Sequence, residues 1–506
     1  MSWQSIPLPH LGLLTAVAFG ALARGASAQQ SVGEFTGHGD VGTVKQPGSA
    51  TYDSTTGVYQ LAGSGANIWA ARDAFHYAWR KMKGDFILTA RGQLVGKGVD
   101  PHRKFGWMIR SSLDSAAVHA SAAVHGDGLV SLQFRKTPGG QTEQVQSTIK
   151  AADVIQLERR GGTYIMSVAK YGDTLSSVQA TDIPLGDDVY VGLFITAHND
   201  TVTERATLSD VRITVPVRTG FVPYREYLGS NVEIMDVATG RRRIVYHATG
   251  SVQAPNWTRD GKALIWNQDG KLYRFDLKTA QPTPINTGER IRNNNDHVLS
   301  FDGKWLGMSD QSDSASRNQS VVYVVPIEGG TPRRITPLFP SYLHGWSPDG
   351  KLLTFTGIRG SAIDIYTIPV TGGTEHALTQ NQAMNDGPEY ALDGRIYFNS
   401  TRSGKMQVWR MNGDGSAPEQ LTNDQFNNWF PHVSPDQRTI VYIAFPPDID
   451  PKDHPWYKHV YLRSMPVRGG PSTVIAYLYG GQGTINVPSW SPDSRFIAFV
   501  SNSDKY

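Results

Sequence analysis

The chain has 506 residues, with 48 Lys and Arg against 45 Asp and Glu, a formal net charge of +3 and no cysteine. Balanced charge without a basic run argues against nucleic acid as a partner, and the lack of cysteine excludes disulfides, thiolate catalysis and Cys-ligated metals. The length predicts two or three domains, and 52 Gly with 29 Pro are typical of a turn-rich all-β chain.

Residues 1–28 are expected to form a signal peptide. A short apolar run from Leu11 to Leu22 precedes Ala26-Ser27-Ala28, a small-x-small cleavage site. We therefore expect an exported protein, periplasmic or extracellular, and the absence of disulfides favours the bacterial periplasm. The run is too short to span a bilayer comfortably, and no later segment is long and apolar enough to be transmembrane. We therefore expect that the protein is not an integral membrane protein.

Between Gly33 and Val217 the sequence predicts short strands without a long repeat. Alternating apolar and polar residues indicate strands at 86–90, 130–135, 163–168 and 189–197. The stretch 65–77, followed by Gly84-Asp85-Phe86, resembles concanavalin-like jelly-roll domains, which are often attached to bacterial proteins that act on sugars. We therefore expect a jelly-roll β-sandwich over residues 33–217. On the face of these strands that points away from the core, the pattern places aromatic and amide side chains together. Rings can stack on a sugar and amides can bond its hydroxyls, unless a loop or the next domain covers this face.

A turn sequence recurs through the second half of the chain. Its fullest copy is Trp346-Ser347-Pro348-Asp349-Gly350, and its aspartates stand at positions 260, 302, 349, 393, 436 and 493. Pro fixes one backbone angle, Asp can bond the backbone ahead of it, and Gly takes the tight position, so each copy predicts a hairpin turn. A period in the forties with four short apolar runs is typical of a β-propeller, one blade per repeat.

The ends of this repeat region predict how the ring closes. After a linker at 219–227, segments 231–236 and 243–246 look like two outer strands, whereas 489–500 supplies two inner strands. If the first pair completes the last blade, no sheet edge is left exposed. The six turns then predict a six-bladed propeller over residues 228–503.

These turns, with the repeat from Tyr366 to Gly373, resemble the TolB-type propeller. The resemblance implies the fold but no single function, because such propellers serve as binding platforms, as lids of peptidases and as lyases. The peptidase type carries a hydrolase domain with a G-x-S-x-G elbow. No such motif occurs in this sequence, so we expect no hydrolase domain.

Aligning the blades on the turn predicts which side chains reach the central channel. One aligned position, two residues before that of His344, is polar or aromatic in every blade: Gln253, Asn295, Tyr342, Asp386, Trp429 and Asn486. We expect these residues to contact a ligand, together with Gln482 in the glycine-rich segment 480–484. That segment lacks the following helix that a phosphate loop needs, so we interpret it as a channel-rim loop.

Four blades carry proline at the position of His344, and the two exceptions are His297 and His344. Their imidazoles, with the nearby Asp296, Asp386, Glu389 and His432, could hold a divalent cation such as manganese, zinc or calcium. A histidine could equally act as the base that removes a proton beside a uronate carboxylate. The predicted catalytic residues are His297, His344, Asp386 and Glu389, and the predicted metal ligands are His297, His344 and His432.

Alternatively, His297 and His344 are hydrogen-bonded residues at the channel mouth that take part in no reaction. Oligogalacturonate lyases are propellers with a His/Gln metal site, but their Gln-x-His-x-His run is absent here. An insertion at 446–457 lengthens the step between the turns at Asp436 and Asp493, and it either shapes the binding face or is a solvated loop. We predict an exported protein that recognises a carbohydrate at the propeller channel mouth, with the sandwich helping to hold a polymer. The alternatives are a carbohydrate-active enzyme, either polysaccharide lyase or glycoside hydrolase, and a protein-binding envelope component.

Overall fold

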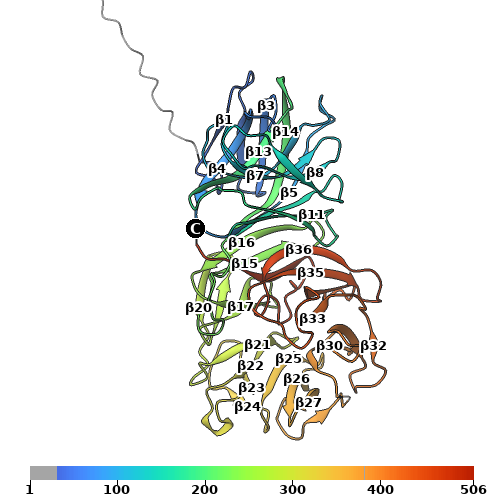
Figure 1. The fold of residues 1–506 in the computed structure, drawn as a ribbon. Helices are drawn as coiled ribbons and strands as arrows, with labels where there is room; N and C mark the ends of the chain where they lie inside the picture. Colours follow the sequence, from blue (N-terminus) through green and yellow to red (C-terminus); the bar gives the residue numbers. More distant parts are fainter. Residues whose placement is uncertain (1–30, 381, 506) are drawn as a thin grey trace, which may run out of the picture.

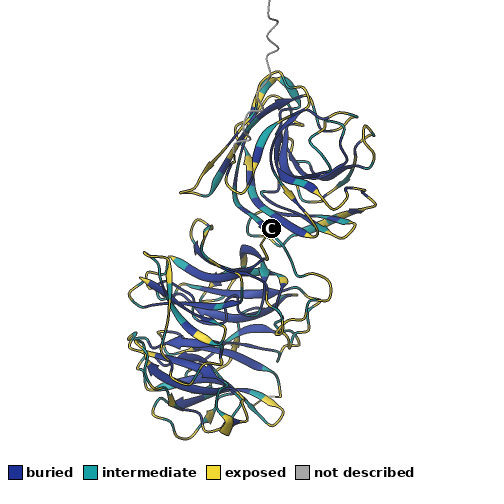
Figure 2. Ribbon diagram, turned by 90° about the vertical axis from the view of Figure 1, so that its left-hand side faces the viewer, coloured by how far each residue is buried: buried dark blue, intermediate teal, exposed yellow. Residues whose placement is uncertain are grey.

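The computed structural model describes residues 31–380 and 382–505, and its regular structure there is almost entirely β. The expected signal peptide lies outside the described residues. A β-sandwich stands on a ring of blades, and buried residues fill the middle of both bodies (Figures 1 and 2). In the described ranges no helix is both long and apolar enough to cross a membrane.

The sandwich consists of two seven-stranded sheets. The first has the order β1 (Gly37–Val41), β4 (Phe75–Met82), β13 (Val189–Thr196), β6 (Lys104–Arg110), β7 (His119–His125), β8 (Val130–Arg135), β9 (Glu143–Gln146). The second has the order β12 (Ser176–Thr181), β11 (Thr163–Ala169), β10 (Val154–Arg160), β5 (Phe86–Leu94), β14 (Asn199–Thr214), β3 (Val58–Gly65), β2 (Ser49–Asp53). The four strands expected from alternation are confirmed as β5, β8, β11 and β13.

The core of the sandwich lies between these sheets and uses alternate residues of each strand, such as Val191 and Leu193 of β13. The other face of the first sheet is partly covered. Arg110 and Arg135 are fully buried there, and both pair with Asp73 of a covering loop, at 3.4 and 2.6 Å. The two-sheet sandwich is therefore confirmed, while its likeness to concanavalin-type domains in particular stays a prediction.

Five blades of the propeller are complete four-stranded antiparallel sheets. Two of them are β17 (Val252–Trp257), β18 (Ala263–Gln268), β19 (Lys271–Asp276), β20 (Gln281–Pro284); and β21 (Asn293–Leu299), β22 (Trp305–Asp310), β23 (Val321–Pro326), β24 (Arg333–Arg334), with the 3₁₀ turn η1 (Ser314–Ser316). The other three are β25 (Ser341–Trp346), β26 (Leu352–Arg359), β27 (Ala362–Pro369), β28 (His376–Ala377); β29 (Asn385–Tyr390), β30 (Ile396–Ser400), β31 (Gln407–Met411), β32 (Glu419–Gln420); and β33 (Asn427–Val433), β34 (Thr439–Phe445), β35 (Lys458–Pro466), β36 (Thr473–Gly480).

The sixth blade closes the ring as expected, because β15 (Ser230–Asp236) pairs with β37 (Phe496–Asn502) and β16 (Arg241–Ala248) lies outside β15. Its innermost segment differs from the expectation. It makes only an isolated bridge, between Trp490 and Ile497, rather than a full strand.

The recurring turns have the chemistry that their sequence predicts. In all six, the aspartate accepts a hydrogen bond from the backbone N–H two residues later, at 3.0 to 3.1 Å. In five, a Ser or Thr hydroxyl two residues earlier donates to the same carboxylate, at 2.5 to 2.7 Å. These aspartates therefore hold the hairpins between β17 and β18 and their equivalents.

A β-bulge interrupts the innermost strand of each complete blade. The pairing of these strands with their neighbours shifts between Gln253 and Asn256, Asn293 and His297, Leu343 and Gly345, Asp386 and Glu389, and Trp429 and His432. A bulge places two residues opposite one and changes the direction in which side chains point. Strict alternation consequently fails at the level of the channel where the candidate site lies.

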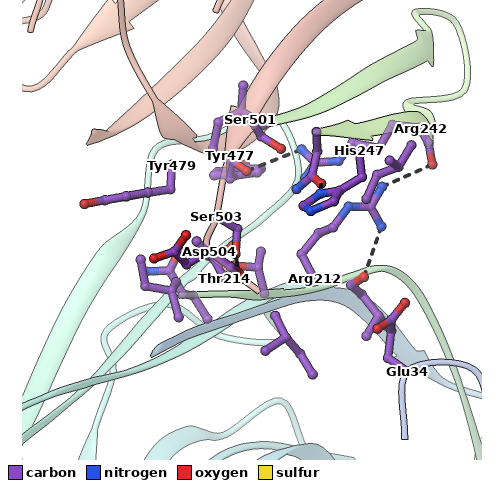
Figure 3. A pocket seen from close by; sticks show the side chains of 18 of the residues that line it. Glu34, Arg212, Thr214, Arg242, His247, Tyr477, Tyr479, Ser501, Ser503 and Asp504 are labelled. Carbon is purple, nitrogen blue, oxygen red and sulfur yellow. Dashed lines mark hydrogen bonds between the residues drawn. The ribbon is translucent and has the colours of Figure 1, made fainter. Parts of the chain in front are cut away.

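The joint between the two bodies contains a buried ion triad. Arg212 of β14 in the sandwich and Arg242 of β16 both contact the fully buried carboxylate of Glu233 in β15, at 2.9 and 3.2 Å. Burial would raise the pKa of Glu233, but the two guanidiniums hold it below its usual value. Arg212 and Arg242 also line an interdomain cavity of about 320 Å³, beside Tyr477 (Figure 3). Both arginines already have a carboxylate partner, so we regard this cavity as part of the domain joint.

Candidate functional site

A cavity of about 330 Å³ opens at one mouth of the propeller channel. Residues of the innermost strands, at or next to their bulges, form part of its lining. Asp296 comes from β21, His344 from β25 and Asp386 from β29. Three successive blades therefore contribute two carboxylates and an imidazole to one space.

His344 lies at the centre of this charged group. Its Nε2 is 3.5 Å from Asp386 Oδ1, and its ring stacks on Phe430 with centroids 5.9 Å apart. The Asp386 carboxylate accepts a 2.6 Å hydrogen bond from the Thr356 hydroxyl. Asp296 accepts a 2.7 Å bond from the Asn294 amide. Both carboxylates are thus held in place by neutral donors.

The protein drives the pKa values of the two carboxyl groups apart. Burial raises the pKa of Asp296 to about 6, against the smaller opposing effect of His344. Burial also acts on Asp386, but the hydrogen bond and charge of His344 outweigh it and lower the pKa to about 2. Burial lowers the pKa of His344 less than Asp296 and Asp386 raise it, so its pKa lies above the usual value. One carboxyl can therefore carry a proton near neutral pH while the other is ionised.

Two segments remote from the inner strands cover the mouth. The insertion 446–457, between β34 and β35, brings His454 against Trp429 and Phe430, with ring centroids 4.5 and 5.3 Å apart. Trp456 of the same insertion contacts Tyr224 of the linker, with centroids 6.0 Å apart. Burial lowers the pKa of His454. The insertion thus contributes His454 to the cavity wall, which is one of the two roles that its sequence left open.

Amide side chains complete the lining of the cavity. Asn294, Asn295, Gln311, Gln482 and Asn486 all face it. Asn486 donates to Gln482 at 2.9 Å and accepts from the backbone N–H of Gly483 at 2.8 Å. Asn295 is only 3% exposed, and within the described part of the chain its Nδ2 has no hydrogen-bond partner. This buried donor needs an acceptor that a ligand could supply.

Six of the residues predicted from the sequence come together here: Asn295, Tyr342, His344, Asp386, Gln482 and Asn486. Asp296 belongs to the same cavity, although the sequence suggested it only as a carboxylate near the histidines and not as an aligned channel residue. Phe430 and His454 also line the cavity and were not predicted as site residues. Asp296 stands one position beyond the aligned Asn295, and the bulge in β21 turns both toward the channel. Counting two-residue steps from the turn could not have found it.

Other predicted residues lie elsewhere. His297 is fully buried beside β18, its Nε2 3.2 Å from the Ile265 carbonyl oxygen, and burial lowers its pKa to about 4. Trp429 is fully buried in an apolar cluster. Gln253 binds the Ser251 hydroxyl at 2.8 Å and is not among the residues that line the cavity. The structure does not bring these three side chains to the Asp296–His344–Asp386 group.

The predicted metal ligands are also separated. His432 lies against Glu389, with Nδ1 and Oε2 2.5 Å apart, and its Nε2 lies 2.6 Å from the Ile485 carbonyl oxygen. His344 instead faces Asp296 and Asp386. In residues 31–380 and 382–505 no group of three or more His, Asp or Glu side chains is arranged to hold a metal ion. The metal site stays a prediction.

The opposite mouth of the channel has a different lining. The last residues of the inner strands and their turns form a smaller pocket walled by Trp257, Trp346 and Trp490. Glu389 lies there with Arg259, whose pKa burial lowers and the nearby Glu389 carboxylate raises. Arg259 also donates to the Ser300 carbonyl oxygen at 3.2 Å. Cationic and anionic groups are therefore matched at this end.

The sandwich has a polar cavity of its own, of about 240 Å³, on the partly covered face of its first sheet. Lys104 is buried there and donates to Gln133 at 3.1 Å, and burial lowers its pKa to about 8. His102, His125 and His198 stand around it, with Trp69 at the rim. Aromatic, amide and cationic groups therefore share this cavity.

Comparison with known proteins identifies relatives of the propeller half. A family model described as the TolB β-propeller domain matches residues 340–448. The protein Atu1656 of Agrobacterium fabrum is 43% identical over 274 residues, which cover 54% of this chain and 92% of that protein. A solved structure assigned to TolB of Agrobacterium tumefaciens is 41% identical, with a TM-score of 0.52, over 54% of this chain and 98% of that one. The peptidase YuxL of Bacillus subtilis is 25% identical over 38% of this chain and 29% of its own length.

Proposed function

The chain belongs to the TolB-like β-propeller family, and from that premise we propose that its channel mouth recognises a carbohydrate. The observation that carries the proposal is the composition of the cavity. Amides, carboxylates, an imidazole and aromatic rings converge in a space of about 330 Å³. Sugars present hydroxyls to such amides and carboxylates, and the apolar face of a sugar ring packs on aromatic side chains.

The unpartnered Asn295 amide and the rings of Phe430 and Tyr342 give this site the two elements of sugar recognition. Burial first, and the two carboxylates second, raise the pKa of Tyr342 to about 12, so its hydroxyl keeps its proton and can donate. The separate cavity around Lys104 in the sandwich enters this proposal as a second contact, for sugar units that carry no positive charge. Export to the periplasm or beyond belongs to this proposal, since polysaccharides are encountered there.

A second candidate function is acid–base chemistry on the bound sugar. It is favoured by the two carboxyl groups of this cavity, whose pKa values are shifted in opposite directions and both of which interact with His344. Such a pair is the arrangement in which one group donates a proton and the other stays ionised. In this alternative Asp296 is the acid, and Asp386 with His344 is the base or charge stabiliser. Glu389 and His297 have no part in it, because neither lines this cavity.

The test separates the two candidates in one experiment. Purified protein is incubated with neutral, basic and acidic polysaccharides, binding is measured by calorimetry, and the products are analysed by mass. Binding without products supports recognition alone. Products that have gained water indicate hydrolysis, and products lacking it indicate elimination; either establishes the enzyme. If no polysaccharide binds, the carbohydrate proposal is wrong and a protein partner becomes the remaining candidate.

A further inference from the structure

We infer that the sugar held at the channel mouth carries a protonated amino group, so that unacetylated amino sugars are its ligand class. This inference rests on the proposed function and adds the charge of the ligand. It follows from two buried carboxyl groups in a cavity whose described lining has no lysine or arginine, together with the groups that surround them.

The lining contains more carboxyl groups than lysine or arginine side chains. Two carboxylates, Asp296 and Asp386, face the cavity, and no lysine or arginine is among the described residues that line it. The imidazole of His344 is shared between both carboxylates. Burial lowers the pKa of the second imidazole, His454, and so favours its neutral form. Since ionised groups attract more strongly away from bulk water, an uncompensated carboxylate here favours a cationic ligand.

The surroundings of the carboxylates suit an ammonium group on a sugar ring. The rings of Phe430 and Tyr342 also line the cavity, and aromatic faces attract cations. Asn295 offers a buried, unpartnered amide donor to a hydroxyl oxygen of the same ring. A simple cation would leave that donor unpaired, whereas an amino sugar supplies both the charge and an acceptor.

The same lining disfavours acidic sugars. A uronate carboxylate would enter beside Asp296 and Asp386 without a lysine or arginine to bind it. Like charges at close range in a buried site repel each other. The cavity around Lys104 in the sandwich has the opposite balance, since its buried cation lies among histidines.

Ligand binding should release protons. A bound ammonium favours the ionised form of Asp296 and disfavours the protonated form of His344, so it lowers the pKa of both groups. The titratable groups that share the cavity with Asp296 are His344, Asp386, Tyr342, His454 and Tyr224. Because the pKa of Asp296 is raised to about 6, release is expected to be largest near that pH.

The experiment is calorimetric titration of the full chain at pH 6 with β-1,4-linked tetramers of glucosamine, N-acetylglucosamine and glucose, a tetramer of galacturonate, and trilysine. Repeating it in two buffers with different protonation enthalpies gives the number of protons released. We expect the glucosamine tetramer to bind roughly tenfold more tightly than the glucose and N-acetylglucosamine tetramers, the scale of one charged hydrogen bond. We expect net proton release with the glucosamine tetramer alone and the weakest binding for galacturonate.

Asp296→Asn should reduce the glucosamine-to-glucose preference to near one and abolish most of the proton release. The matched control is Glu328→Gln, which removes an exposed carboxylate of the same propeller outside the cavity and should leave preference and release unchanged. The proton release of the unmodified chain requires no variant, so the inference stays testable if Asp296→Asn does not fold.

The outcomes separate the two levels of the argument. Equal binding of the glucosamine and glucose tetramers overturns the amine preference and leaves carbohydrate recognition standing. Tightest binding of galacturonate overturns it in the same way. Binding of trilysine with no binding of any sugar overturns both proposals, as does the absence of all binding.

Discussion

The two mouths of the propeller channel hold the same kind of residue pair in different surroundings. At one mouth His344 lies near Asp386, and at the other His432 lies near Glu389. Glu389 has Arg259 in its pocket, and both ring nitrogens of His432 are close to an oxygen atom. His344 is instead shared with a second carboxylate, Asp296, in a cavity whose described lining has no lysine or arginine. A His–carboxylate pair alone therefore does not indicate a binding site. The charged groups around the pair decide whether a carboxylate is left without a partner that a ligand could supply.

The largest expected effect is on stability, from a substitution in the core next to the mouth that holds Asp296, His344 and Asp386. Trp429→Ala should lower the free energy of unfolding by roughly 3 to 5 kcal/mol, because it removes a fully buried indole from the core. Denaturant unfolding measures this, with Trp305→Ala as the control, since Trp305 is 43% exposed. A cost below about 1 kcal/mol would mean that Trp429 is a surface ligand contact after all.

At the mouth where Glu389 lies with Arg259 and His432, a substitution should change the stability of the protein rather than ligand binding. Glu389→Ala leaves His432 buried without its carboxylate and should cost about 3 kcal/mol, as when one partner of a buried pair is lost. Binding of the sugar ligand at the other mouth should change by less than about twofold, well below the scale of one hydrogen bond. Loss of ligand binding in a folded Glu389→Ala protein would place Glu389 in the site and erase the distinction between the mouths.

The polar mouth should show an unusual pH dependence. The pKa of Asp296 is raised in the folded protein to about 6, so between pH 4 and pH 6 the folded chain binds more protons at this group than the unfolded chain. Its contribution therefore makes the folded state lose stability as pH rises through that window, on the order of 3 kcal/mol in all. Asp296→Asn removes this contribution, so the variant should gain stability relative to the unmodified chain between pH 4.5 and 7. Chemical unfolding at both pH values measures the difference, and a constant difference would contradict the assignment.

The smallest effect is expected at the repeated turns. Asp349→Ala removes a carboxylate that accepts from Ser347 and from the Lys351 backbone on an exposed hairpin, and should cost about 1 kcal/mol or less. Ligand binding should not change, because the turn lies outside the channel-mouth cavity. Weakened binding with unaltered stability would show that the turns act in recognition as well as in folding.

The sequence alone determined the propeller, its number of blades and the closure of its ring. Those features depend on local chemistry that repeats, such as Asp349 and its equivalents bonding the backbone two residues ahead. It also located six residues of the cavity. Five of them, including His344 and Asp386, follow from the fixed distance between each turn and its inner strand, and Gln482 follows from the glycine-rich segment 480–484.

Only the tertiary structure decided which aligned residues share a site. The bulges in β21, β25 and β29 shift the pairing of each strand, so Asp296 joins the cavity while His297, its neighbour, is buried against β18. His454 reaches the mouth from an insertion whose path no repeat specifies. A bulge and a long loop are fixed by contacts between distant segments, which a single strand's alternation does not encode.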